Sequence, residues 1–147
     1  MNFWFKSSNT SPGSSYHMPF EGTANSNQSY EMSIHSSGYL RGGLIVAGSR
    51  KVDNCTSKVL LNGNWHMCSM TYDGATIKRY VDGVMEKSTS VTGALATSTA
   101  FVLGHYGSNT SYCAKEVYIS DVRLYVTALS EADIKQLYEM GGKVDNK

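Results

Sequence analysis

The 147-residue sequence has little proline, little charge and little cysteine, and these shortages narrow what the protein can be. Only 17% of its residues are charged, and the formal net charge is +1. No run of Lys and Arg exceeds two residues, which excludes the basic surface typical of a nucleic-acid-binding protein. No apolar stretch approaches the length of a membrane span.

The first residues also lack the charged start and apolar run of a signal peptide. This absence predicts that the protein is made in a cytoplasm.

The three cysteines are Cys55, Cys68 and Cys113. An odd number, without a Cys-x-x-Cys or Cys/His spacing, argues against a disulfide framework and against a zinc site. Three free and mostly buried thiols are favoured, because a free cysteine behaves as a small apolar residue. One bridge with a spare thiol is the alternative.

What the chain has in quantity is the composition of a β protein. Tyr, Phe, Val, Thr and Ser are plentiful, and 41% of the residues are hydrophobic. The clearest pattern lies at residues 65–90, where three alternating segments are separated by Asp73-Gly74 and Asp82-Gly83. Asp-Gly between alternating segments is a strong hairpin signal, because Gly tolerates positive φ. We therefore expect a three-stranded meander here.

Further strands are predicted elsewhere by alternation or by short apolar runs. The segment 117–126 breaks its alternation near Ser120-Asp121, which indicates a β-bulge. Residues 7–29 are polar and are expected to be irregular, although residues 16–20 either anchor a loop or form another strand. The other predicted strands are 2–6, 30–34, 44–47 and 100–103.

Only the C-terminal segment has the signals of a helix. Ser130 is placed to cap it, and Asp133 lies in its first turn, where the helix dipole favours negative charge. Leu129 and Ile134 have the spacing of a hydrophobic staple. Gly141 and its neighbour are expected to end the helix.

The order of these motifs resembles the laminin G-like domains of the concanavalin A-like lectin/glucanase superfamily. The resemblance implies an all-β, antiparallel two-sheet β-sandwich, a concanavalin A-like jelly roll, with one short C-terminal helix. It implies one domain over residues 1–140, followed by a tail or linker at 141–147. The motifs that carry it are Phe3-Trp4-Phe5-Lys6, Trp65-His66, Tyr72-Asp73-Gly74, Tyr80-Val81-Asp82-Gly83, Leu103-Gly104, the segment 118–125, and Ala128-Leu129-Ser130 with Ile134, Leu137 and Tyr138.

The closing segment is similar to copies of this domain in phage and prophage structural proteins. That similarity implies a site of action on a virion or outside the cell. Members of the family usually have a strand and a loop ahead of the Phe-Trp strand, so a sheet edge is left open to a protein partner or a second copy unless a later segment fills it. Arg79 stands where the family usually has an apolar residue, and is either exposed on the outer sheet or paired inside.

No catalytic residues are predicted. Glucanases on this fold carry clustered carboxylates along one strand, whereas the carboxylates of this chain are scattered. Gly-x-Ser-x-Gly, Walker and zinc motifs are also missing. Trp65 and Tyr80 are interpreted as packing residues, and His66 as a surface or packing histidine. We therefore expect a protein that is not an enzyme.

No cofactor is expected to be required. The resemblance does allow Ca²⁺ at a loop rim, where Asp and Asn oxygens are suitable ligands. Asp121, Asp53 and Asn54 are the candidate metal ligands.

The best candidates for ligand binding are two loops that combine aromatic and polar side chains, as sugar sites do. The first, at 104–112, contains His105, Tyr106, Asn109 and Tyr112, and the second, at 38–42, contains Tyr39 and Arg41. They favour a non-catalytic carbohydrate-binding or adhesion module that contacts a glycan or a cell-surface polysaccharide. The alternative is a structural or protein–protein interaction module without a glycan ligand.

Overall fold

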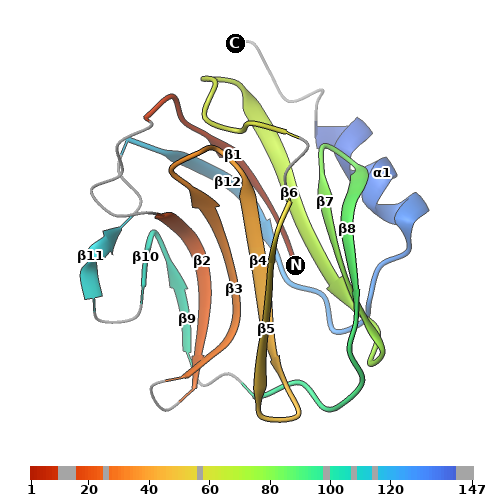
Figure 1. Ribbon diagram of the computed structural model, residues 1–147. Coiled ribbons are helices and arrows are strands. Elements are labelled where there is room, and N and C mark those ends of the chain that lie inside the picture. The colour runs from red at the N-terminus through yellow and green to blue at the C-terminus, as the bar shows by residue number, and fades with distance from the viewer. Residues whose placement is uncertain are drawn as a thin grey trace.

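The computed structural model describes residues 1–9, 16–24, 27–55, 58–97, 100–106, 109–113 and 116–141. These residues form two antiparallel five-stranded sheets packed face to face, a small hairpin and one helix (Figure 1). The predicted β-sandwich with a short C-terminal helix is confirmed.

Sheet A contains, in spatial order, β12 (Tyr118–Arg123), β1 (Asn2–Lys6), β6 (Trp65–Tyr72), β7 (Thr76–Val81) and β8 (Val84–Ser90). Sheet B contains β5 (Ser49–Asn54), β4 (Leu40–Val46), β3 (Asn27–His35), β2 (Tyr16–Ala24) and β9 (Ala100–Leu103). The hairpin pairs β10 (His105–Tyr106) with β11 (Asn109–Cys113), and the helix is α1 (Glu131–Gly141).

The main core lies between the two sheets and follows the period-two alternation of the strands. Each sheet turns alternate apolar side chains inward, so that these side chains are excluded from water. The fully or almost fully buried members are Phe3, Phe5, Met32, Ile34, Leu40, Leu44, Val46, Cys68, Met70, Ile77 and Val81.

The prediction that residues 7–29 are irregular is wrong, because β2 and the start of β3 lie within them. β2 pairs with β3 on one side and with β9 on the other. Backbone hydrogen bonds in this ladder do not require apolar side chains, so a polar segment is held as a central strand by its neighbours. Of the two alternatives for residues 16–20, the strand is the one that forms.

The strand predicted at 117–126 is shorter, and its bulge is confirmed. Trp4 pairs with Ser120 and Asn2 with Arg123, so two residues of β12 oppose one of β1, and Asp121 has a φ of 49°. The strand ends at Arg123, and Val126 beyond it is fully exposed. β12 also occupies the edge that the sequence left open, because β1 lies between β12 and β6.

Helix α1 covers part of the outer face of sheet A. Its Ile134 is buried against Trp4, Met67 and Tyr80, and the ring of Tyr138 stacks on Trp4 at 5.7 Å between centroids. A second, smaller core therefore lies outside the sandwich and joins the helix to the sheet.

The predicted N-terminus of α1 is confirmed in detail. The Ser130 hydroxyl accepts the Asp133 amide at 3.2 Å, and the Ser130 amide donates to the Asp133 carboxylate at 2.9 Å. The helix ends at Gly141, where an added Cβ would lie 2.6 Å from Trp4 Cζ2. Glycine is thus required there for close packing as well as for termination.

Arg79 is paired inside the sandwich, which decides the open alternative. Its side chain is fully buried, and its Nε donates to the Gly42 carbonyl of sheet B at 2.8 Å. Nη1 donates to Thr89 Oγ1 at 3.0 Å and lies 3.6 Å from Asp53 Oδ2. Because Gly42 has no Cβ, the guanidinium stem passes directly over the backbone of β4.

Cys55 and Cys68 are free and buried, as predicted, and burial raises the pKa of the Cys55 thiol to about 11. The side chain of Cys113 lies outside the described residues. No helix in the described part of the chain is both long enough and apolar enough to cross a membrane.

Candidate binding surface

The residues predicted to bind a ligand are divided between the β10–β11 hairpin and the start of β4 in sheet B. His105 and Tyr106 belong to β10, and Asn109 and Tyr112 to β11, a hairpin beside β2 (Figure 1). The placement of their side chains lies outside the described residues. Tyr39 precedes β4, and the strand order puts β3 between β4 and β2. The fold therefore does not bring the two predicted loops together into one continuous rim.

Arg41 belongs to an ion-pair cluster on sheet B. Glu31 of β3 is buried, and its carboxylate lies 3.0 Å from Arg41 Nη1 and 2.5 Å from Arg50 Nη2. Two cations therefore compensate one buried carboxylate, and together they join β3, β4 and β5. This arrangement gives Arg41 a structural partner within its own sheet.

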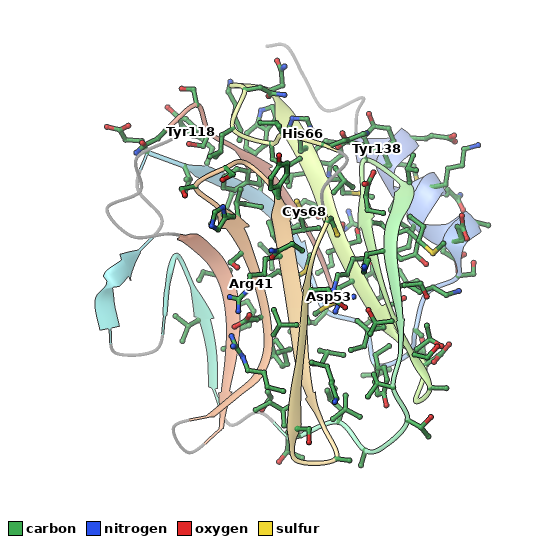
Figure 2. All side chains as sticks on the ribbon, viewed as in Figure 1. Arg41, Asp53, His66, Cys68, Tyr118 and Tyr138 are labelled. Atoms are coloured by element: carbon green, nitrogen blue, oxygen red, sulfur yellow. The ribbon has the colours of Figure 1, made fainter. Side chains whose placement is uncertain are left out.

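The predicted metal ligands do not converge. Asp53 of β5 accepts a hydrogen bond from Thr89 of β8 and faces Arg79 (Figure 2), while the adjacent Asn54 is exposed. Asp121 lies on β12, at the other edge of sheet A from β8, and pairs with Arg123 at 2.6 Å. Among the described residues, no group of three or more His, Cys, Asp or Glu side chains is placed to hold a metal ion.

A different surface emerges on the outer face of sheet A, beyond the part that α1 covers. Lys6 of β1 pairs in register with Trp65 of β6 on one side and with Tyr118 of β12 on the other. These three residues, here called the aromatic row, cross three adjacent strands. Trp65 is 39% exposed and Tyr118 is 64% exposed, so both rings are open to solvent.

The members of the aromatic row contact one another. The rings of Trp65 and Tyr118 meet edge to face, with centroids 6.4 Å apart and planes inclined by 62°. Lys6 Nζ lies 5.8 Å from the centroid of the Tyr118 ring, a cation–π geometry. An ammonium group thus lies over the ring of Tyr118, which in turn contacts Trp65.

A depression of about 470 Å³ borders the aromatic row and adds polar groups to it. Lys6, Ser8, Gly63, Glu116 and Tyr118 line it. Ser7 fixes its floor, because its hydroxyl donates to the Glu116 carbonyl at 2.9 Å and its carbonyl accepts the Gly63 amide at 3.0 Å. The surface therefore combines aromatic rings with an ammonium, a hydroxyl and a carboxylate.

The segment that leads into Trp65 is held by His66, whose ring is mostly buried at the same end of the sandwich as Tyr118 (Figure 2). His66 Nδ1 lies 2.9 Å from Asp82 Oδ2, and Nε2 lies 3.1 Å from Asn62 Oδ1. The other Asp82 oxygen accepts the Met67 amide at 3.0 Å. His66 therefore ties the loop before β6 to the turn after β7, rather than acting only as a packing residue.

These contacts favour the ionised form of the Asp82 carboxyl group. Partial burial alone would raise the pKa of Asp82, but the hydrogen bonds from His66 and from the Met67 amide outweigh it. Its pKa is therefore lowered, and the carboxylate is ionised at neutral pH.

Sequence reasoning assigned both Trp65 and Tyr80 to packing. Tyr80 is buried as expected, whereas Trp65 contacts Tyr118 and is 39% exposed. Both residues point to the outer face of sheet A, but α1 covers Tyr80 and leaves Trp65 uncovered. Alternation showed that Trp65 shares a face with Met67. It did not show which part of that face the helix would occupy, nor that Lys6 and Tyr118 would be the neighbours.

The sandwich and its outer helix define a lectin-like fold. A family model described as the concanavalin A-like lectin/glucanases superfamily matches residues 1–135. The chain therefore belongs to this superfamily. No curated protein sequence is significantly similar to it.

Solved structures with the same fold include binding domains of toxins and a pentraxin. The binding domain of Paraclostridial Mosquitocidal Protein 1 superposes with a TM-score of 0.73 at 16% identity, over 97% of this chain and 37% of that one. The botulinum neurotoxin serotype G binding domain gives 0.70 at 15% identity, over 97% and 36%. The heptameric SAP-like pentraxin from Limulus polyphemus gives 0.69 at 18% identity, over 93% and 68%.

The chain spans little more than a third of the toxin binding domains that it resembles. At these identities the likeness concerns the fold.

Proposed function

We propose that this protein is a non-catalytic carbohydrate-binding module, and that the aromatic row is its ligand platform. Pyranose rings carry an apolar face of C–H groups, which packs on aromatic rings, and hydroxyls, which hydrogen-bond to polar side chains. The exposure of Trp65 and Tyr118 beside the polar depression is the observation that carries the proposal.

The exposure of these rings has no explanation in the fold itself. Trp4, on the same strand and the same face as Lys6, is covered by α1, and Tyr80 is covered as well. The described residues leave Trp65 and Tyr118 in contact with each other and with solvent. Exposed aromatic side chains grouped beside a polar depression are a feature of ligand-binding surfaces.

A shallow platform of this size binds weakly as a single copy. Affinity then rises when many copies engage a surface that carries many glycans. Display on a phage or prophage virion, which the resemblance of the closing segment suggests, would supply such copies. We include this display in the proposal.

The proposal is tested by screening a glycan array with the protein multimerised on beads, in Ca²⁺ and again in EDTA. We expect binding to a related set of sugars, and a loss of at least tenfold in Trp65→Ala and Tyr118→Ala. Phe101→Ala is the matched control, because Phe101 is an exposed aromatic residue on β9 of the other sheet. Thermal unfolding of each variant confirms that the fold is intact.

Two further variants test the loop that the sequence suggested. If Tyr106→Ala and Tyr112→Ala abolish binding while Trp65→Ala does not, the ligand lies on the β10–β11 hairpin and the aromatic row is the wrong platform. Loss of binding in EDTA would place Ca²⁺ at the site, with Asp53, Asn54 and Asp121 as the first residues to substitute. If the folded protein binds no glycan in either Ca²⁺ or EDTA, the proposal is refuted and the structural module is favoured.

A further inference from the structure

We propose that the ligand of the aromatic row is an acidic glycan, a pyranose whose carboxylate or sulfate group binds the Lys6 ammonium. This inference rests on the proposed function and names the class of sugar that the site would select. It follows from the position of Lys6 in the aromatic row and from the groups that contact its ammonium.

Lys6 lies at the centre of the surface that a sugar would cover. Its strand is flanked by the strands of Trp65 and Tyr118, and all three residues share one register. Its ammonium approaches the face of the Tyr118 ring. A sugar ring bound beside Tyr118 would therefore also lie close to the ammonium.

Among the described residues, the ion pairs of the carboxylates are made with cations other than Lys6: Glu31 with Arg41 and Arg50, Asp53 with Arg79, Asp82 with Lys58 and His66, Asp121 with Arg123, and Glu139 with Lys135. The contact that the structure shows for the Lys6 ammonium is the cation–π contact with Tyr118.

A sugar that covers the Lys6 ammonium must replace its interactions with water, and acidic and neutral sugars differ in how well they do so. A neutral sugar would displace water from the charge and return only hydroxyl contacts, so part of its stacking energy would be lost to desolvation. A sugar with a carboxylate or sulfate replaces that water with a charge-assisted hydrogen bond. The site therefore discriminates in favour of acidic sugars by the same contact that penalises neutral ones.

Glu116 sets the orientation of such a ligand. It is exposed and lines the same depression as Lys6, where it repels an acidic group and accepts hydrogen bonds from sugar hydroxyls. The acidic substituent is thus directed to Lys6 and away from Glu116. The two side chains are expected to respond to substitution with opposite signs.

The test compares matched glycans that differ only in the acidic group. Oligosaccharides of glucuronate and of glucose form one pair, and sulfated and unsulfated galactosides form the other. Binding is titrated at low and at high NaCl concentration with the wild-type protein and with three variants: Lys6→Gln, Lys6→Arg and Glu116→Gln. Lys51→Gln is the control for charge, because it removes an exposed lysine from β5 of the other sheet.

We expect the acidic member of at least one pair to bind about tenfold more tightly than its neutral partner, and to weaken as salt rises. Lys6→Gln should weaken acidic binding about three- to tenfold, Lys6→Arg should restore it, and Glu116→Gln should strengthen it. Preference for glucuronate or for the sulfated sugar tells which acidic group is recognised.

The inference is overturned if neutral glycans bind equally well and Lys6→Gln changes nothing, while Trp65→Ala still abolishes binding. In that case the proposed carbohydrate-binding function stands and only its ligand class is wrong. If no glycan of either pair binds, and the array is also silent, the proposed function itself fails. If Lys51→Gln weakens acidic-glycan binding as much as Lys6→Gln does, the effect is one of general charge, and the role of Lys6 is also overturned.

Discussion

Truncation of Arg79 is expected to destabilise the protein more than replacement by an apolar residue of similar length. The guanidinium crosses the sandwich, and its two hydrogen bonds go to Gly42 O and Thr89 Oγ1. Its Nη2 atom has no partner although the side chain is fully buried. Burial lowers the pKa of Arg79, the nearby Asp53 opposing this only in part. The charge is therefore only partly compensated in the core.

The expected magnitudes follow from these contacts. Arg79→Ala removes an aliphatic stem that lies beside Gly42, worth roughly 2 kcal/mol at about 0.8 kcal/mol for each buried methylene. It also leaves buried acceptors without a donor, at about 1–3 kcal/mol. We expect a total loss of about 3–5 kcal/mol in the free energy of unfolding. Arg79→Met keeps most of the stem volume and removes the buried charge with its unpartnered Nη2, but it leaves the same acceptors without a donor, so its loss should be about 1–3 kcal/mol.

The measurement is equilibrium unfolding in urea at pH 7, followed by far-ultraviolet circular dichroism. The slope of the free energy against urea should be the same in all three proteins, so that midpoints report stability alone. The reasoning is refuted if Arg79→Met is as destabilised as Arg79→Ala, because the charge itself would then be essential. It is also refuted if Arg79→Ala loses less than about 1 kcal/mol, because the acceptors would then be satisfied by other groups.

Three further perturbations probe other contacts. Asp82→Asn should lose about 1–2 kcal/mol at pH 7. Because the folded-state pKa of Asp82 is lowered, this contribution is present above the ordinary Asp range and disappears as pH falls through the folded-state value, so wild type and variant should converge in acid. Gly141→Ala should lower the free energy of unfolding by about 1–3 kcal/mol despite the better helix propensity of Ala, because the added Cβ would meet Trp4. Unchanged stability in a urea titration would contradict that packing. Glu31→Gln should lower thermal stability, with a loss of about 2–3 kcal/mol, because two arginines lose the charge of one buried carboxylate. Unchanged thermal stability would show that both arginines rehydrate fully.

Local features were predictable because they depend on neighbours in the sequence. Asp82 and Gly83 both adopt positive φ in a two-residue turn between Val81 and Val84, as the Asp-Gly signal predicts. The cap at Ser130 forms because the hydroxyl and the amides that it satisfies are three residues apart.

Features that depend on pairing were not predictable in the same way. β2 mixes polar and apolar residues without a clear alternation, and it pairs with β3 and β9, which lie on either side of it. The sequence left open whether Arg79 is exposed or paired inside, because its partner Gly42 comes from the other sheet, 37 residues away.

The candidate site shows the same division. Trp65 was recognised as a family motif residue and assigned to packing, and Tyr118 was recognised as part of a strand. That Lys6 would lie between them depends on the order β12–β1–β6, which brings together three segments far apart in the chain.

The sequence by itself determined the meander, the bulge and the capped helix, because each follows from spacing along the chain, and its resemblance to a known family indicated the fold class and the superfamily. Only the tertiary structure decided which part of the outer face of sheet A the helix covers. Exposure of Trp65 and Tyr118 is set by that coverage, and the position of Lys6 on the strand between theirs is set by strand order. Both are properties of how distant segments pack, and the period-two alternation of any one strand does not contain them.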